Sequence, residues 1–421
     1  MENSKVHKEV LELKHLFSNT WWNTDKQIPS LGEKTNYWQK RKKEKETDKF
    51  TREFMLLIEG FPEAEESRKL WRNSTRLLID DFVSKSDLIS RSDKEILLNQ
   101  GMLENTKSFI DEARSFNKNI SMDDIGQAMR NVWIMNIIQM LLGKDTKLTP
   151  AIFGYSMLYP YTDNYLDDEK ISKEEKLVVS DRFEKRLAGY KIEAENEYEK
   201  SLFKLVDKIE HQYNRSQYPQ VFESLISIHQ AQIKSLLQQG KKTGPYETDI
   251  LGISIEKGGI SVLADAYLVN GTLRDEEASF FFGYGVLLQI CDDLQDSKED
   301  IENGHMTVIS QISGKWPLDS ITSGLINFTN DLIENVQCFN CDKIEELKNL
   351  IRKNCILLIL LAIAKNKKLY SRKYFREMKQ YFPYRISYMS NFNKRLKKKY
   401  CNINSSYSGV KTEDIIIYAL G

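Results

Sequence analysis

The sequence predicts an all-α fold, and three observations support this prediction. The chain of 421 residues contains only 8 Pro and 20 Gly, which leaves room for long uninterrupted helices. Apolar residues recur with helical spacing along most of the chain, and we find neither strand alternation nor a hairpin signal. A chain of this length can bury a substantial core, as one large helical domain or as two smaller ones.

The first 50 residues give the weakest signals. Residues 40–49 form a charged run that is typical of a solvated helix face or a linker. Residues 50–117 show roughly helical apolar spacing. Further along, residues 125–142 form a strong helical pattern that ends at Gly143, and Pro150 fits the first turn of the next helix.

The second half of the chain continues the helical pattern. Dense i,i+4 charge pairing runs over residues 174–213, and helical apolar spacing over residues 221–239. Residues 239–245 are the clearest loop. Three more helices are expected around residues 320–336, 344–364 and 374–399. Residues 355–364 are the longest apolar run and are too short to cross a bilayer.

Composition limits the classes of function. The 61 Lys and Arg balance the 61 Asp and Glu, so charge gives no argument for a nucleic-acid or acidic partner. Five Cys and no N-terminal apolar segment predict reduced thiols and a cytoplasmic protein. Cys338 and Cys341 form a lone CxxC without a second pair, so no zinc site is expected.

Two acidic clusters follow apolar helical runs. In GVLLQICDDLQD, Asp292 and Asp296 stand i and i+4 on one helix face, with Asp293 beside them. In FGYSMLYPYTDNYLDDE, Asp163 and Asp167 have the same spacing, and Asp168 follows directly. Crowded carboxylates repel one another unless a cation lies among them, and oxygen ligands suit Mg²⁺ before Zn²⁺. The alternative interpretation is an acidic helix end that faces water.

The second cluster resembles the GxxxQxxDDxxD signature of class I isoprenoid synthases, which comprise polyprenyl diphosphate synthases and terpene synthases. Every fixed position of the signature is present: Gly285, Gln289, Asp292, Asp293 and Asp296. The DNYLDD sequence at 163–168 resembles a variant of the family's first aspartate-rich motif, with the order DxxxDD. The resemblance covers roughly residues 129–307.

Two further stretches resemble parts of the same family. Lys257, 35 residues before Asp292, resembles the lysine that precedes the second motif, and Gly258 stands where the family usually has Thr. The SKEDIENGHMTVIS sequence after Asp296 resembles an acidic loop ending in Gly-Lys-x-Thr. His305 stands where lysine is common, and Thr307 matches the threonine.

The resemblance implies the fold and the domains. It implies an all-α class I isoprenoid synthase (terpene synthase) helical bundle around a central cleft. Residues 121–400 would form the catalytic domain, residues 1–120 an N-terminal helical extension packed on it, and residues 401–421 a C-terminal tail. A homodimer without nucleic acid or a transmembrane segment is the expected assembly.

The resemblance also implies the site. Three Mg²⁺ ions are expected on Asp163, Asp167, Asp168, Asp292, Asp293 and Asp296. The expected catalytic residues are Asp163, Asp292, Lys257 and Tyr159, and the expected ligands of the substrate diphosphate are Lys257, Gln289, Arg385 and Tyr388. From the residues alone, Lys257 could equally be a surface lysine, Gln289 a core glutamine, Tyr159 plain core and His229 a structural histidine.

The missing motifs distinguish between reactions. Chain elongation needs a second diphosphate site, which the family builds from a GKxxRP stretch and an Arg-Arg pair, and this chain contains neither. We therefore expect a terpene synthase (cyclase) that acts on one linear prenyl diphosphate. The alternatives are a chain-elongating polyprenyl diphosphate synthase, a non-catalytic subunit of a heteromeric synthase, and a phosphohydrolase. The absence of a His-Asp dipeptide argues against the last.

Overall fold

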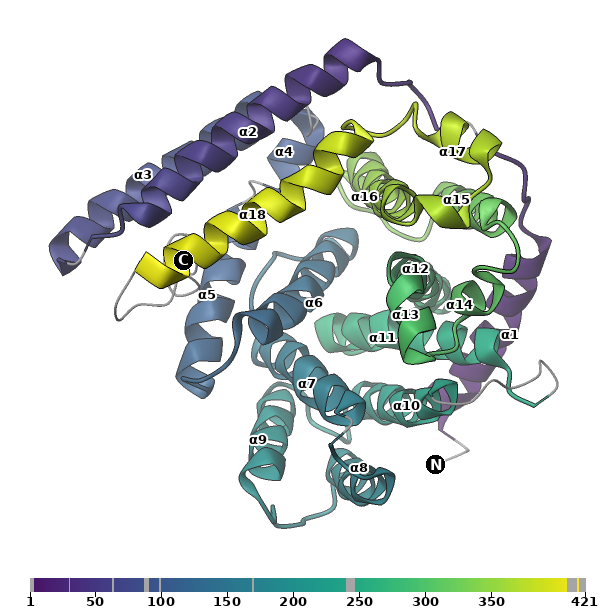
Figure 1. Cartoon of the computed structure of the whole chain (residues 1–421). Helices are drawn as coiled ribbons and strands as arrows, with labels where there is room; N and C mark the ends of the chain where they lie inside the picture. The colour runs from purple at the N-terminus through teal and green to yellow at the C-terminus, as the bar shows by residue number, and fades with distance from the viewer. Residues whose placement is uncertain are drawn as a thin grey trace. The chain divides into compact units, whose positions relative to one another are not determined.

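The computed structural model describes residues 4–29, 31–62, 64–86, 91–97, 100–168, 170–239, 247–406 and 415 (Figure 1). Within these residues the secondary structure is α-helical apart from two 3-10 turns and an isolated bridge between Gln239 and His305. The described part of the chain contains no β-strand. The predicted all-α fold class is therefore confirmed.

The chain divides into two compact units. Unit 1 comprises Met1–Pro29 and Asp123–Ser371, and unit 2 comprises Ser30–Met122 and Arg372–Gly421. These boundaries differ from the predicted division at residues 120 and 400. The first 29 residues group with the helices that carry the acidic clusters, whereas residues 372–400 group with the N-terminal segment.

Unit 1 carries both acidic clusters. Its helices, in chain order, are α1 (Lys5–Asn23), α6 (Met122–Leu141), α7 (Pro150–Asp167), α8 (Lys173–Leu187), α9 (Glu197–Gln212), α10 (Pro219–Ser235), η1 (Leu236–Gln238), α11 (Ile250–Asn270), α12 (Asp275–Gln295), α13 (Ser297–Asn303), α14 (Val308–Ile312), α15 (Asp319–Glu334), α16 (Ile344–Lys365) and η2 (Lys367–Leu369). Nearly every residue of α11 is buried, because α1, α7, α10 and α12 all pack on it. Figure 1 shows α11 and α12 at the centre of unit 1.

The sequence of α1 explains why it belongs to unit 1. Its buried residues Val6, Val10, Leu13, Phe17 and Trp21 recur every three or four positions and form one apolar stripe. This stripe packs on α10, α11 and α12, and the Phe17 ring stacks on Phe282 of α12 at 5.8 Å. The predicted N-terminal extension therefore begins only after Pro29.

Local signals place the start of α7 as predicted. The Thr149 side chain accepts a hydrogen bond from the Ile152 backbone N–H, and Pro150 occupies the first turn. Upstream, α6 ends at Leu141, and Gly143 has a φ of +66°, a conformation that glycine adopts without steric cost. The predicted loop at 239–245 lies, except for Gln239, outside the described residues.

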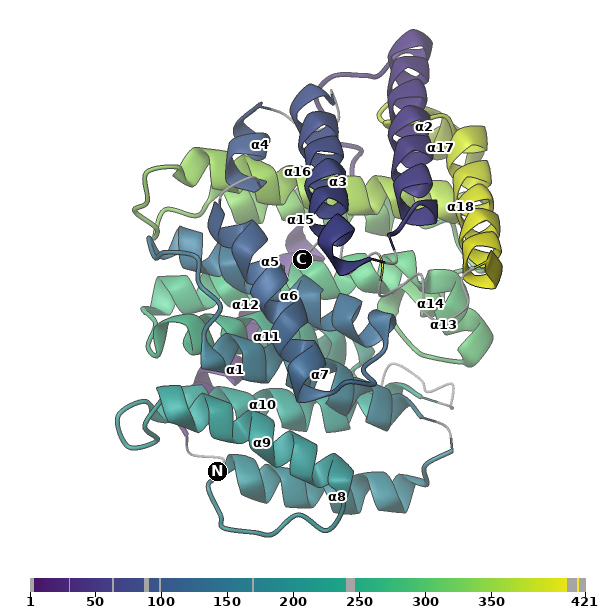
Figure 2. The ribbon, with the colours of Figure 1, turned by 90° about the vertical axis from the view of Figure 1, so that its left-hand side faces the viewer.

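Unit 2 is a second set of helices: α2 (Tyr37–Glu59), α3 (Glu65–Lys85), α4 (Arg91–Leu97), α5 (Gln100–Phe116), α17 (Arg372–Met378) and α18 (Ile386–Ser406). In Figures 1 and 2, α2 and α18 lie side by side. The single helix predicted over residues 374–399 is wrong, since the chain breaks between α17 and α18. Pro383 lies in this break, and proline both lacks an N–H and disfavours helix at the preceding residue.

No helix in the described part of the chain combines the length and the apolar character that a membrane span requires.

Candidate functional site

Two glycines let α11 and α12 cross closely. A Cβ built on Gly285 would lie 2.0 Å from the Gly258 carbonyl oxygen, and one built on Gly258 would lie 2.4 Å from the Gln289 Cβ. A side chain at either position would force the helices apart. The crossing also sets Lys257, the neighbour of Gly258, within electrostatic reach of Asp292 and Asp293.

The first and second clusters meet at Lys257. The Lys257 Nζ on α11 lies 3.6 Å from the Asp163 Oδ1 on α7, and both side chains are largely buried. Asp163 and burial raise the pKa of Tyr159 far above its usual range, with Asp292 adding to this effect and Lys257 opposing it. Asp163, Tyr159, Lys257 and Asp292 therefore lie within electrostatic reach of one another.

The second cluster holds carboxylates that resist ionisation. Asp293 is buried, and burial raises the pKa of its carboxyl to about 7 although the Gln289 Nε2 donates to its Oδ1 at 2.9 Å. Asp292 has an exposed side chain, but loss of hydration and then the neighbouring Asp296 raise its pKa as well. Gln289 thus has a partner inside the cluster and holds Asp293 in place.

One carboxylate of the site was missed by the sequence analysis. Burial and, after it, the charges of Asp293 and Asp296 together raise the pKa of Asp300 on α13 to about 7. The Asp300 backbone N–H donates to the Asp296 carbonyl at 2.9 Å, so the helical path continues past the end of α12. Asp300 follows Asp296 by four residues and Asp292 by eight. The sequence therefore already indicated that Asp300 lies on the same helix face as these two aspartates.

Two cations of the site were also missed. Arg130 on α6 lowers the pKa of both Tyr159 and Asp292, so its guanidinium lies near them. On α16, the Lys365 Nζ lies 3.7 Å from the Asp296 Oδ1. Neither residue belongs to a motif, and only the packing of α6 and α16 brings them to the clusters.

His305 also lies within electrostatic reach of Lys257 and Asp163. Burial lowers the pKa of His305, with Lys257 acting in the same direction and Asp163 opposing it, so the imidazole is neutral at pH 7. The backbone holds His305 in an isolated antiparallel bridge with Gln239. His305 thus places an uncharged imidazole near Lys257 and Asp163.

The first cluster contributes one carboxylate that can be placed. Asp163 is at the site, whereas the side chain of Asp167 lies outside the described residues. Asp168 is the exposed residue that ends α7, and its Oδ1 accepts from the Lys170 backbone N–H at 2.9 Å. The expected metal contacts of Asp167 and Asp168 stay predictions.

The donor set suits Mg²⁺ in combination with a phosphate ligand. Among the described residues, no three His, Cys, Asp or Glu side chains stand close enough to hold a metal ion by themselves. Mg²⁺ is, however, commonly held by one or two carboxylates together with phosphate oxygens of a substrate. The protein ligands that fit this pattern are Asp163, Asp292, Asp293 and Asp296. A cation among them would relieve the repulsion that raises the pKa of Asp292 and Asp293.

Arg385 and Tyr388, the other two expected ligands of the substrate diphosphate, lie in unit 2. The Arg385 guanidinium pairs with the buried Glu44 carboxylate at 2.7 Å. The Tyr388 hydroxyl donates to Asp48 at 3.0 Å. Both side chains hold α18 against α2, and their contact with diphosphate stays a prediction.

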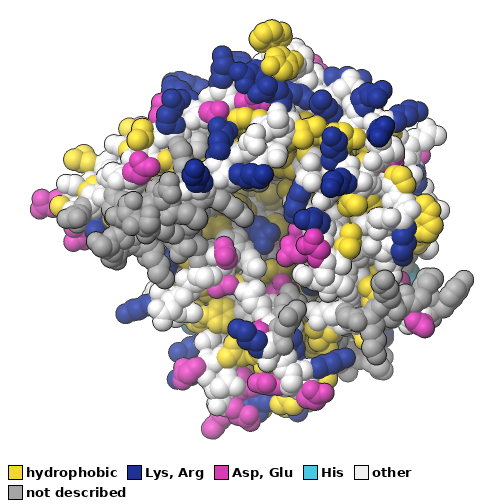
Figure 3. All heavy atoms as spheres, viewed as in Figure 1, with side chains coloured by type: hydrophobic (Ala, Val, Ile, Leu, Met, Phe, Trp, Pro, Cys, Tyr) yellow, Lys and Arg dark blue, Asp and Glu magenta, His cyan; other side chains and the backbone are white. Residues whose placement is uncertain are grey.

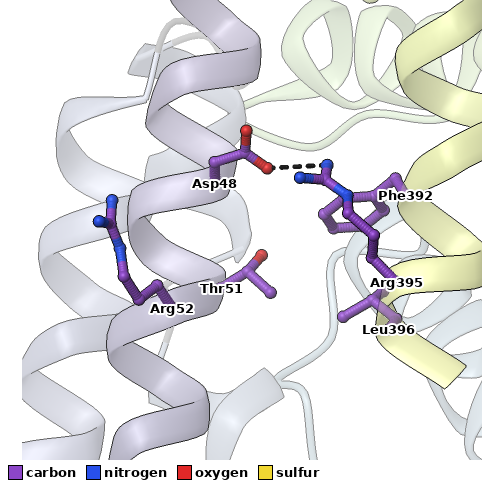
Figure 4. A pocket seen from close by; sticks show the side chains of 6 residues that line it. All are labelled: Asp48, Thr51, Arg52, Phe392, Arg395 and Leu396. Carbon is purple, nitrogen blue, oxygen red and sulfur yellow. Dashed lines mark hydrogen bonds and ion pairs between the residues drawn. The ribbon is translucent and has the colours of Figure 1, made fainter. Parts of the chain in front are cut away.

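Unit 2 has a cavity of its own of about 300 Å³, drawn in Figure 4. Its lining residues are Asp48, Thr51, Arg52, Phe392, Arg395 and Leu396. Asp48, its carboxylate, pairs with Arg395 at 3.0 Å across the gap between α2 and α18. A single carboxylate that already has a partner does not provide a metal or acid–base site, so this cavity is not the candidate site.

The two units differ in charge. Ser30–Met122 and Arg372–Gly421 together hold 29 Lys and Arg against 20 Asp and Glu, which is an excess of nine positive charges. Because the whole chain is neutral, unit 1 has an equal excess of negative charge. Figure 3 shows Lys and Arg side chains gathered along α2 and α17.

The chain matches none of the protein-family models, curated proteins or solved structures with which it was compared.

Proposed function

We propose that unit 1 is a class I terpene synthase that uses Mg²⁺ to ionise a linear prenyl diphosphate and cyclises the resulting carbocation. One observation supports this proposal above the others. Carboxylates from α7 and α12 converge with Lys257 of α11, and loss of hydration and repulsion by Asp296 raise the pKa of Asp292. Such a group favours divalent cations that bridge to an anionic ligand.

The residues of the site have separate tasks in this reaction. Asp163, Asp292, Asp293 and Asp296 would hold Mg²⁺ ions, with one or two of these carboxylates on each ion together with diphosphate oxygens. Bound Mg²⁺ would neutralise the charge of the departing diphosphate. Lys257 and Arg130 add fixed positive charge beside the same oxygens. Gln289 keeps Asp293 oriented through their 2.9 Å hydrogen bond.

The carbocation needs an apolar and aromatic surrounding that excludes bulk water. Tyr159 stands one helical turn before Asp163 and is the aromatic ring nearest in sequence to the first cluster on that helix face. Its hydroxyl stays protonated, because burial and Asp163 raise its pKa. A neutral ring at this position can stabilise positive charge through its face.

The chain-elongating polyprenyl diphosphate synthase remains the second candidate, and one observation favours it. Arg130 and Lys365 add cations to the site beyond Lys257, and a second diphosphate needs such charge. The isolated arginines after the first cluster do not fill this role in the present structure. Arg182 pairs with Glu199 at 2.7 Å, and Arg186 bonds Glu210.

One assay separates the two candidates. The full-length protein is incubated with Mg²⁺ and each linear prenyl diphosphate, with and without isopentenyl diphosphate, and the organic extract is analysed. We expect cyclic hydrocarbon or alcohol without isopentenyl diphosphate. If the product is instead a longer prenyl diphosphate that forms only when isopentenyl diphosphate is present, the protein is the chain-elongating synthase and not the cyclase. No turnover of any prenyl diphosphate would reject both.

A further inference from the structure

A small cavity of about 20 Å³ lies among α7, α8 and α10. Most of its wall is aromatic or aliphatic, and its polar side chains are Tyr155, Tyr159, Thr162, His229 and Gln232. Tyr159 belongs both to this wall and to the group around Asp163, so the cavity adjoins the candidate site. A cavity of this size with two to four polar partners has room for about one water molecule.

His229 lines this cavity and has a buried ring nitrogen that accepts no hydrogen bond from the described residues. Its side chain is only 4 % exposed, and its Nε2 lies 2.9 Å from the Ser180 carbonyl oxygen. Because a carbonyl only accepts, Nε2 carries the ring hydrogen and Nδ1 is the acceptor. Nδ1 is buried without a hydrogen-bond partner among the described residues. Burial also lowers the pKa of His229, which keeps the ring neutral.

The other polar groups on the wall are weaker bases or already have partners. The Thr162 hydroxyl donates to the Leu158 carbonyl at 3.0 Å, and the Gln232 Nε2 lies 3.5 Å from the Thr162 Oγ1. Burial raises the pKa of Tyr155, which bonds Ser261, so its hydroxyl stays protonated. No carboxylate lines the cavity. His229 is therefore the strongest base among the side chains that line it.

We infer that His229 binds one water molecule in this cavity and activates it as the nucleophile that ends the reaction, so that the product is an alcohol. This inference rests on the proposed function. The water oxygen forms the C–O bond with the carbocation while one O–H bond breaks and its proton moves to Nδ1. The imidazolium then returns the proton to solvent or to the released diphosphate. The sum is prenyl diphosphate plus water giving alcohol plus diphosphate and a proton.

The test uses the full-length protein, Mg²⁺ and each linear prenyl diphosphate in water enriched in ¹⁸O. Diphosphate release reports ionisation, and mass spectrometry reports the alcohol, its label and the hydrocarbon. We expect a labelled alcohol from the wild type. In His229→Leu, the rate of diphosphate release should stay within about threefold of the wild-type rate. The alcohol-to-hydrocarbon ratio should fall about tenfold or more below that of the wild type, as expected for loss of a general base.

Two variants on the same helix serve as comparison. Gln232→Leu removes another polar partner of the water and should lower the alcohol-to-hydrocarbon ratio in the same direction. Gln230→Leu is the matched control, because Gln230 bonds Glu184 at 2.9 Å and does not line the cavity. Its ratio should equal that of the wild type. If His229→Leu does not fold, His229→Gln and Gln232→Leu decide the question.

The possible failures are distinguishable. Hydrocarbon as the sole wild-type product, or an unchanged ratio in the folded His229 and Gln232 variants, overturns the role of His229 and leaves the proposed function standing. Absence of diphosphate release from every prenyl diphosphate overturns the proposed function and, with it, this inference.

Discussion

Gln289 donates a hydrogen bond from Nε2 to the Oδ1 of Asp293 at 2.9 Å, and the pKa of Asp293 is nevertheless raised to about 7. A hydrogen bond to a carboxylate favours its ionised form, whereas burial disfavours it. Burial has the larger effect here. The metal-free site thus holds a carboxyl that titrates near physiological pH, and this gives the protein a stability that depends on pH.

The metal-free protein should lose stability as the pH rises from about 4 to about 7. Folded Asp293 keeps its proton up to about pH 7, whereas an unfolded Asp loses it near 3.9, so the folded state binds more protons between these values. Urea unfolding with a chelator over this pH range measures the effect. In Asp293→Asn the free energy of unfolding should fall less over this pH range, by up to about a few kcal/mol.

Asp181→Asn is the control for this titration, because Asp181 is an exposed carboxylate on α8 that pairs with Lys185. Its pH dependence should equal that of the wild type. If the free energy of unfolding depends on pH equally in Asp293→Asn and the wild type, Asp293 is ionised in the folded protein.

Asp292→Ala and Asp163→Ala should each abolish turnover while helix content, measured by circular dichroism, stays intact. Removing a carboxylate from a repelling group does not weaken the metal-free fold through charge. We expect less than about a tenth of the wild-type rate, a barrier increase above ~1.4 kcal/mol. Asp181→Ala should keep full activity, and a residual rate above a tenth in either cluster variant contradicts the metal assignment.

Gly285→Ala should destabilise the protein by about 1–3 kcal/mol, the usual cost of overpacking. The added Cβ would meet the Gly258 carbonyl oxygen at 2.0 Å and force α11 and α12 apart. Gly126→Ala on α6 is the matched control, since a Cβ there meets nothing within 4 Å. It should stabilise the helix by up to about 1 kcal/mol. Equal unfolding free energies of the two variants would refute the close crossing.

Tyr159→Ala should change the product pattern more than the rate of diphosphate release, because its ring lines the cavity beside the clusters. Gas chromatography of the extract measures the pattern. Tyr165→Ala, which removes a ring stacked on Tyr198 at 4.5 Å, should leave the products unchanged. An unchanged pattern in Tyr159→Ala together with a lower melting temperature would assign Tyr159 to the ordinary core.

The sequence alone determined the features that depend on neighbours along the chain. Pro150 predicted the start of α7, and the spacing of Asp292 and Asp296 predicted one acidic helix face. Helical periodicity and capping act over three or four residues, so a local pattern contains the information. The resemblance to a signature then joined Lys257 to the two clusters.

Only the tertiary structure decided which distant side chains share the site and how the chain is grouped. Arg130 and Lys365 reach the carboxylates through the packing of α6 and α16, and no spacing along the chain encodes that approach. The neutral total charge likewise hides a negative unit 1 and a positive unit 2. Amino-acid composition gives only the total charge of the chain. Which residues are buried and which touch one another depends on which apolar faces pack together in the folded protein.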